Sequence, residues 1–196
     1  MKRYIKSAVV NVSEMSWQEK GDFARDPEAS PNILRQIFSS CDASETALLS
    51  YLATNPSTPV DVLSAMADMN DQELHKDLLY NENLPKEILD RLASEDNYTI
   101  QYGIAQHHNT SAKTLRRLVS HNNRYDILSQ VVTNPNVTLS IALAALKKSP
   151  DVRVADRYNT PVEVLEKLAE DDEWLVAQEA KNTLAMLSRW SRSSQQ

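Results

Sequence analysis

The stretch that decides the fold is Asn55-Pro56-Ser57-Thr58-Pro59-Val60-Asp61-Val62-Leu63, because its pattern recurs along the chain. A second clear copy is Asn159-Thr160-Pro161-Val162-Glu163-Val164-Leu165. Successive copies are 29, 26, 26, 27 and 23 residues apart when they are aligned on the position of Pro59. A period in this range is typical of stacked supersecondary units, which usually bind along an extended surface. The aligned anchor residues are Ser30, Pro59, Pro85, Ser111, Thr138 and Pro161.

Apolar residues recur at fixed offsets from each anchor. One set lies three, four, seven and eight positions after the anchor, which places it on one face of a helix. A shorter set lies eleven, seven and six positions before the anchor and also has helical spacing. Each unit is therefore predicted to contain two helices. In the second unit the two sets are Val62, Leu63, Met66 and Ala67, and Leu48, Leu52 and Ala53.

A turn signal lies between the two predicted helices. Asn55-Pro56 suits the first two positions of a type I turn, because proline presets φ and the Asn side chain bonds to backbone ahead of it. The second helix then has a capping signal, with Thr58 as N-cap, Pro59 as first helical residue and Asp61 three residues after the cap. This arrangement predicts a capping box. The same signal recurs as Thr160, Pro161 and Glu163.

The composition favours helices and excludes several functions. Only 2 glycines occur in 196 residues, and strand-like alternation is weak and confined to the region from Tyr4 to Val12. No stretch approaches the roughly 20 apolar residues that span a bilayer, and the first residues lack the features of a signal peptide. Cys41 is the only cysteine, so the chain alone cannot build a disulfide or a multi-cysteine metal site. We expect a cytoplasmic protein that does not contact membranes.

Three patterns in the sequence carry a resemblance to a known family. They are the turn at residues 55–59, the Glu-Val-Leu-x-x-Leu-Ala helix at residues 163–169, and the lead-in Val152-Arg153-Val154-Ala155. Through them, residues 23 to 172 resemble the leucine-rich repeat variant family. The resemblance implies a right-handed solenoid of two antiparallel helices per repeat, one of them often a 3₁₀ helix. It implies a scaffold and no particular activity. The iron-sulfur module of some members is not carried over, because Cys41 is the only cysteine.

The predicted fold is therefore all-α, a right-handed α-solenoid of about six two-helix repeats with a C-terminal capping helix. Because the units are longer than the resemblance implies, we expect several of them to contain two α-helices. We divide the chain into an N-terminal arm at 1–18, a repeat array at 19–172, and a capping helix with a disordered tail at 173–196. The arm could pair as an edge strand, pack over the first repeat or stay mobile.

Charge is distributed unevenly along the chain, although the total is −6. Residues 7–96 contain 6 Lys or Arg against 17 Asp or Glu, a net of −11, whereas residues 97–157 contain 8 against 3, a net of +5. The basic segment predicts a site for an acidic protein surface or for nucleic-acid phosphates. The alternative is an ordinary solvated face with cations near helix C-termini, where the helix dipole favours them. The basic residues concerned are Lys113, Arg116, Arg117, Arg124, Lys147 and Lys148.

Two tyrosines share a register in this segment. Tyr98 and Tyr125 both lie thirteen residues before an anchor, so they should lie on one edge of the solenoid. Tyrosines in such a place are candidate binding residues, because they bury a large area at low entropy cost. The alternative is that each one caps the neighbouring pair of helices.

The sequence predicts a non-enzymatic scaffold that binds another macromolecule, in the first place a protein. One alternative is a nucleic-acid-associated protein that uses the basic segment 113–157, and another is an enzyme with a site in the concave groove. His107, His108 and His121 have no metal-ligand spacing, and no nucleophile-base pair is recognisable. We expect no catalytic residue, no cofactor and no metal, and the sequence leaves the partner's identity and the oligomeric state open.

Overall fold

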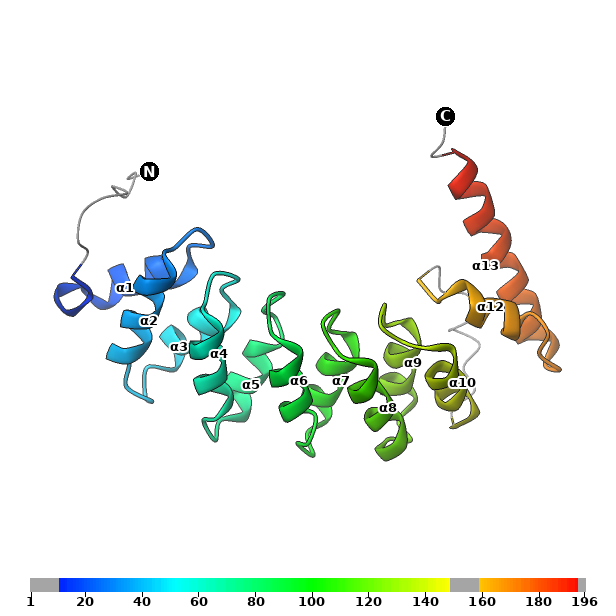
Figure 1. Cartoon of the computed structure of the whole chain (residues 1–196), viewed down its shortest axis with the longest axis horizontal. Coiled ribbons are helices and arrows are strands. Elements are labelled where there is room, and N and C mark those ends of the chain that lie inside the picture. The colour runs from blue at the N-terminus through cyan, green and yellow to red at the C-terminus, as the bar shows by residue number, and fades with distance from the viewer. Residues whose placement is uncertain (1–10, 149–158, 194–196) are drawn as a thin grey trace. The chain divides into compact units, whose positions relative to one another are not determined.

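The computed structural model describes residues 11–148 and 159–193, and every regular element in those ranges is helical. The prediction of an all-α fold is confirmed for this part of the chain. Figure 1 shows short helices joined by short loops, coloured from blue to red along the chain. The contacts divide the protein into two compact units, residues 1–88 and 89–196, which we describe one at a time.

Unit 1 is built from short helices in which alternate elements lie side by side. Helix α3 contacts both α1 and α5, while α2 packs against α1 and α4 packs against α5. Helix α6 (Lys86–Leu92) begins in this unit and ends in unit 2. The other elements are η1 (Val12–Glu14), α1 (Trp17–Arg25), α2 (Pro31–Ser40), α3 (Thr46–Thr54), α4 (Val60–Ala67) and α5 (Gln72–Leu78).

Unit 2 repeats the arrangement. Helix α9 lies against α7, α8 and α10; α10 also contacts α8 and α12, and α13 covers α12. The first and second helices of successive repeats therefore form separate layers within the unit. Its elements after α6 are α7 (Tyr98–Gln106), α8 (Ala112–His121), α9 (Tyr125–Thr133), α10 (Leu139–Lys148), α12 (Val162–Leu168) and α13 (Trp174–Ser193).

The two predicted apolar stripes are buried. In unit 1, Leu48, Leu52 and Ala53 of α3 are fully buried, and so are Leu63 and Met66 of α4. In unit 2 the equivalent positions of α7, α8, α9 and α10 are also buried. Burial of these side chains is the main source of stability in such short helices, which are marginal in isolation. The unit 2 residues are Ile100, Ile104, Ala105, Leu115, Leu118, Ile127, Val131, Ile141 and Ala145.

The predicted turns form. The amide of Thr58 donates to the carbonyl of Asn55 over 3.0 Å, and the amide of Val137 donates to the carbonyl of Asn134 over the same distance. The Asn55 side chain also accepts from the amide of Ser57 over 2.8 Å, as the turn signal predicted.

The predicted capping box at Thr58 is wrong. Helix α4 begins at Val60 after an N-cap at Pro59, with no side-chain cap bond. The buried Thr58 hydroxyl instead donates to the carbonyl of Leu52 over 2.6 Å and so satisfies the end of α3. Asp61 lies in the first turn of α4 and pairs with Arg35, with nitrogen–oxygen distances of 2.7 and 3.0 Å.

The second predicted capping box fails in the same way. Helix α12 begins at Val162 after Pro161, again without a side-chain cap bond, and Thr160 is buried. In both places the threonine is buried and the N-cap is the proline that follows it, so tertiary packing overrides the local capping preference.

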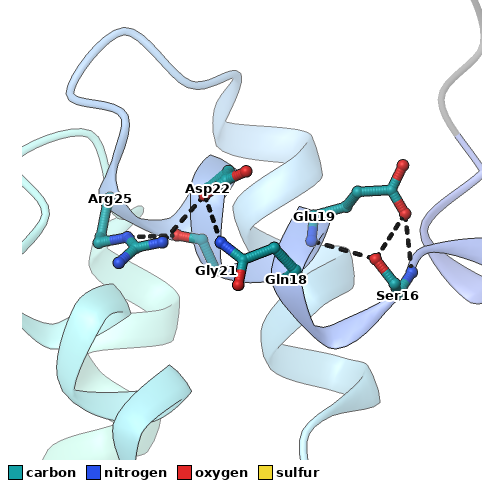
Figure 2. Close-up of polar contacts among 6 residues, drawn as sticks. All are labelled: Ser16, Gln18, Glu19, Gly21, Asp22 and Arg25. Atoms are coloured by element: carbon teal, nitrogen blue, oxygen red, sulfur yellow. Dashed lines mark hydrogen bonds and ion pairs between the residues drawn. The ribbon is translucent and has the colours of Figure 1, made fainter.

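A capping box does form at a place where the sequence did not predict one. Figure 2 shows the start of α1, where the Ser16 hydroxyl accepts from the amide of Glu19 over 3.3 Å, and the Glu19 carboxylate accepts from the amide of Ser16 over 2.9 Å. At the other end of α1, Arg25 donates to Asp22 and to the carbonyl of Gly21. The guanidinium of Arg25 also lies 4.7 Å from the centre of the Tyr51 ring, which ties α1 to α3.

The predicted first helices of the second, fourth and fifth repeats are all α-helices of 9 residues. They are α3, α7 and α9. In the described residues a 3₁₀ helix occurs only at η1, outside the predicted repeats. Helix α1 begins within the predicted arm, and α13 extends from Trp174 to Ser193. Strand pairing near residues 4–10 was one of the options for the arm, and these residues lie outside the described ranges.

At three of the turns, the asparagine four residues before the anchor also bonds to the preceding turn. Nδ2 of the buried Asn55 donates to the carbonyls of Ala24, over 2.7 Å, and Asp26, over 2.9 Å. These carbonyls lie six and four residues before the preceding anchor. The same pattern joins Asn81 to Ala53 and Asn55, and Asn134 to Ala105 and His107.

Candidate functional site

The outer face of α8 carries most of the predicted basic residues. Thr114, Leu115, Leu118 and Val119 are buried, so helical periodicity turns positions 113, 116, 117 and 120 outward. Three of these four positions are cationic. Some of the predicted basic residues are hydrogen-bonded to neighbouring helices, and others have no partner among the described residues.

Arg117 belongs to the first group. Its guanidinium reaches back to the end of α6, where it donates to the Ser94 hydroxyl over 2.5 Å and, at the limit of hydrogen-bond distance, to the carbonyl of Asp90 over 3.4 Å. Arg117 therefore helps to hold α8 against α6 through its hydrogen bonds.

Lys148 is also used by the fold. Its ammonium group donates to the carbonyls of Val119, Ser120 and Asn122, over 2.5, 3.1 and 3.2 Å. These carbonyls lie at the end of α8, where no helical amide can reach them. Lys148 thus caps the C-terminus of the neighbouring helix, an arrangement that the helix dipole favours.

Lys113, Arg116 and Lys147 are exposed and have no hydrogen-bond or ion-pair partner in the described part of the chain. The repeat register explains why Arg116 is unpaired. In the first repeat, Arg35 lies five residues after its anchor, as Arg116 does in the fourth. Arg35 pairs with Asp61, which lies two residues after the anchor of the second repeat. The residue two positions after the anchor that follows Arg116 is Ser140, which carries no charge.

The tyrosine prediction leads to a second cluster, at the starts of α7 and α9. The Tyr98 hydroxyl donates to the carboxylate of Asp126, and the Arg124 guanidinium lies 4.1 Å from the centre of the Tyr98 ring. The Tyr98 and Tyr102 rings are 5.9 Å apart. Tyr125 is exposed and lies on the same edge of unit 2, because it begins α9 as Tyr98 begins α7.

The titration of this cluster follows from its contacts. The hydrogen bond to Asp126, together with burial, raises the pKa of Tyr98. Burial opposes ionisation of Asp126, but the Tyr98 hydroxyl, the amide of Ile127 and the charge of Arg124 outweigh it and lower the pKa of Asp126. Tyr98 is thus held as a neutral donor between a cation and an anion, which fixes the orientation of its ring.

The remaining candidates offer little for catalysis. Burial raises the pKa of the Cys41 thiol to about 11, so almost none of the nucleophilic thiolate exists at neutral pH. His107 and His108 stack with ring centres 5.0 Å apart, and Nδ1 of His107 accepts from the amide of Asn109 over 3.1 Å. No three His, Cys, Asp or Glu side chains among the described residues are placed to hold a metal ion.

The chain matches no model of a known protein family, and comparisons with curated proteins and with solved structures found no similar protein. The resemblance to the leucine-rich repeat variant family therefore rests on its sequence motifs alone. None of the helices in the described part of the chain combines the length and the apolar character that crossing a bilayer requires.

Sequence reasoning missed two kinds of residue at this surface. It did not single out Asp126, although an acidic residue beside Arg124 in a basic segment was a usable signal. It also missed Leu139 and Leu143, which are exposed on α10 beside the cations. A leucine at an offset outside the two apolar stripes was the available signal for Leu143.

Proposed function

We propose that this protein is a non-enzymatic, cytoplasmic scaffold that binds a protein partner, and that Lys113, Arg116 and Lys147 bind an anionic part of that partner. We further propose that the helical repeats form a right-handed solenoid of leucine-rich-repeat-variant type. The observation that carries the binding proposal is a group of three exposed cations on α8 and α10 that have no partner among residues 11–148 and 159–193. In the same unit, Arg117 and Lys148 are bonded to the fold.

Unpaired exposed cations favour a ligand for an energetic reason. An anion that meets Arg116 or Lys147 breaks no ion pair with the described residues, so none of the charge–charge attraction is spent on replacing such a pair. Such charges also steer an oppositely charged partner toward the surface and raise the association rate. The Tyr98–Arg124–Asp126 cluster adds an aromatic surface of fixed orientation, and Tyr and Arg are residue types enriched in binding hot spots.

The proposal is tested with a triple variant, Lys113→Glu, Arg116→Glu and Lys147→Glu. The wild-type chain and the variant are used to capture partners from an extract of the source cells treated with nuclease, and the captured proteins are quantified. A charge-matched control carries Lys86→Glu, Lys181→Glu and Arg189→Glu, which are exposed and unpaired in the described residues. Arg117 and Lys148 are left unchanged, because their loss would also disturb the packing of α8.

We expect the triple variant to lose its specific partners and the control to retain them. Equal capture by the two variants would refute the basic site. A parallel titration with single- and double-stranded oligonucleotides tests the alternative function. Tight binding that weakens steeply as salt rises, and that the triple variant abolishes, would replace the protein partner by nucleic acid.

A further inference from the structure

We propose that the partner segment bound at this surface is acidic and also carries an apolar side chain, which packs on Leu139 and Leu143 of α10. The inference rests on the proposed function, because it names the chemical class of the segment that the three cations bind. It goes beyond that function because it adds an apolar contact that charge alone would not require.

Leu143 is an apolar residue at a position that is polar or charged in the other repeats. It lies five positions after its anchor, at the offset that faces the next repeat, as the Arg35–Asp61 pair shows in unit 1. The other residues at this offset are all polar or charged. Leu143 is 39% exposed and Leu139, one turn earlier on the same side of α10, is 38% exposed. The polar residues at the offset of Leu143 are Arg35, Ser64, Asp90, Arg116 and Glu166.

Two of the three cations lie on the same helix as these leucines or on a helix in contact with it. Lys147 follows Leu143 by four residues, so it lies one turn further along the same face of α10. Arg116 has the same offset as Leu143 on the contacting helix α8, and packed helices lie about 8–10 Å apart. The exposed residues of α10 between Arg116 and Leu143 are Ser140 and Ala144, which are both small. Charge and apolar area therefore lie within reach of one short peptide segment.

This combination favours a peptide over nucleic acid. A phosphate backbone would pair with the cations but has no apolar group to cover Leu139 and Leu143. An acidic segment with an apolar residue satisfies both, because its carboxylates meet Arg116 and Lys147 while its apolar side chain removes leucine area from water. An extended segment of about six residues spans roughly 20 Å, enough to cross from α8 to the far side of α10.

The experiment uses the full chain and a displayed library of short random peptides as the probe. Peptides that bind the wild type are sequenced, and the most enriched peptide is synthesised in two forms, one as selected and one with its apolar residues replaced by serine. Both forms are titrated against Arg116→Glu and Leu143→Ser. The matched controls are Lys181→Glu and Leu175→Ser on α13, which change an exposed cation and an exposed leucine of the same unit. Circular dichroism confirms that each variant is folded.

We expect enriched peptides to combine Asp or Glu with a large apolar residue. Leu143→Ser and the serine-substituted peptide should each weaken binding about tenfold, because binding then no longer removes the same apolar area from water. The two changes should not weaken binding further when they are combined. If Arg116→Glu weakens binding but Leu143→Ser does not, the inference fails and the proposed function stands. If no peptide is enriched, or if binding is indifferent to Arg116→Glu, the proposed function fails and the inference fails with it.

Discussion

Replacing Asn134 by alanine should destabilise unit 2 out of proportion to the few atoms removed. The Asn134 side chain is 2% exposed and donates to the carbonyls of Ala105 and His107, over 2.8 and 3.0 Å. It also accepts from the amide of Asn136 over 2.9 Å. Asn134→Ala removes all three hydrogen bonds, although the carbonyl of His107 keeps a second bond from the amide of Thr110, over 3.0 Å. The loss should lower the free energy of unfolding by about 2–3 kcal/mol.

Two further variants extend this prediction, one as a second test of the donated bonds and one as a control. Asn134→Asp has nearly the same shape but turns an acceptor toward two carbonyl oxygens, so it should cost about 3 kcal/mol or more. Asn123→Ala, at an exposed loop position with no bonded partner in the described residues, should change stability by less than about 0.5 kcal/mol. Urea unfolding followed by circular dichroism measures all three. Equal stability of Asn134→Ala and Asn123→Ala would refute the role of the asparagine bonds.

Three other perturbations have defined outcomes. Ser16→Ala removes the capping box of α1 and should cost about 1 kcal/mol in urea unfolding, whereas Ser13→Ala, outside that helix, should cost less. Lys148→Met should cost about 1 kcal/mol because it uncaps α8, and the same change at Lys147 should not affect stability. The bond to Arg35 lowers the pKa of Asp61, so the pair stabilises the fold above the unfolded-state pKa of Asp61 and loses this effect as pH falls through the lowered value. Asp61→Asn should therefore be slightly less stable than wild type near neutral pH and equal to it in strong acid, and a difference that grows on acidification would contradict this.

The sequence predicted the helices well because burial follows periodicity. The stripe of α4 needed only the spacing of Val62, Leu63 and Met66 to be recognised, and all three are buried. A period of 3.6 residues is set by the backbone, so it does not depend on which neighbour a side chain meets. The positions of the turns followed from proline and asparagine for the same local reason.

The partners of polar side chains were harder to predict. Thr58 could cap α4 or satisfy the end of α3, and the local motif favours the cap. The structure has the second arrangement, because tertiary packing buries the hydroxyl beside the carbonyl of Leu52. Likewise, the sequence indicates that Asn55 can accept a bond within its own turn, but its two donated bonds go to two carbonyls that lie 31 and 29 residues earlier.

The candidate site shows the same limit. Sequence placed Arg116 and Arg117 together on the polar face of a helix, and that placement agrees with the buried stripe of α8. It could not separate them, because the direction of each depends on how neighbouring repeats stack. Arg117 lies against α6 behind it, while Arg116 occupies the offset that faces forward. Two adjacent arginines on one helix therefore differ, because one bonds to a neighbouring helix and the other is available to a partner.

The asparagine bonds have a consequence for how such a chain can change length. The amides of Asn55, Asn81 and Asn134 each donate to two carbonyls of the preceding repeat that lie at the same positions relative to its anchor. The fourth repeat has His107 at the position of these asparagines, yet the carbonyl of His107 still accepts from Asn134. Because the acceptors are backbone carbonyls, a repeat can receive the next asparagine whatever side chain it carries at this position. Inserting a whole repeat ahead of one of these three asparagines should therefore leave its buried amide with acceptors, whereas an insertion of another length would leave it without them.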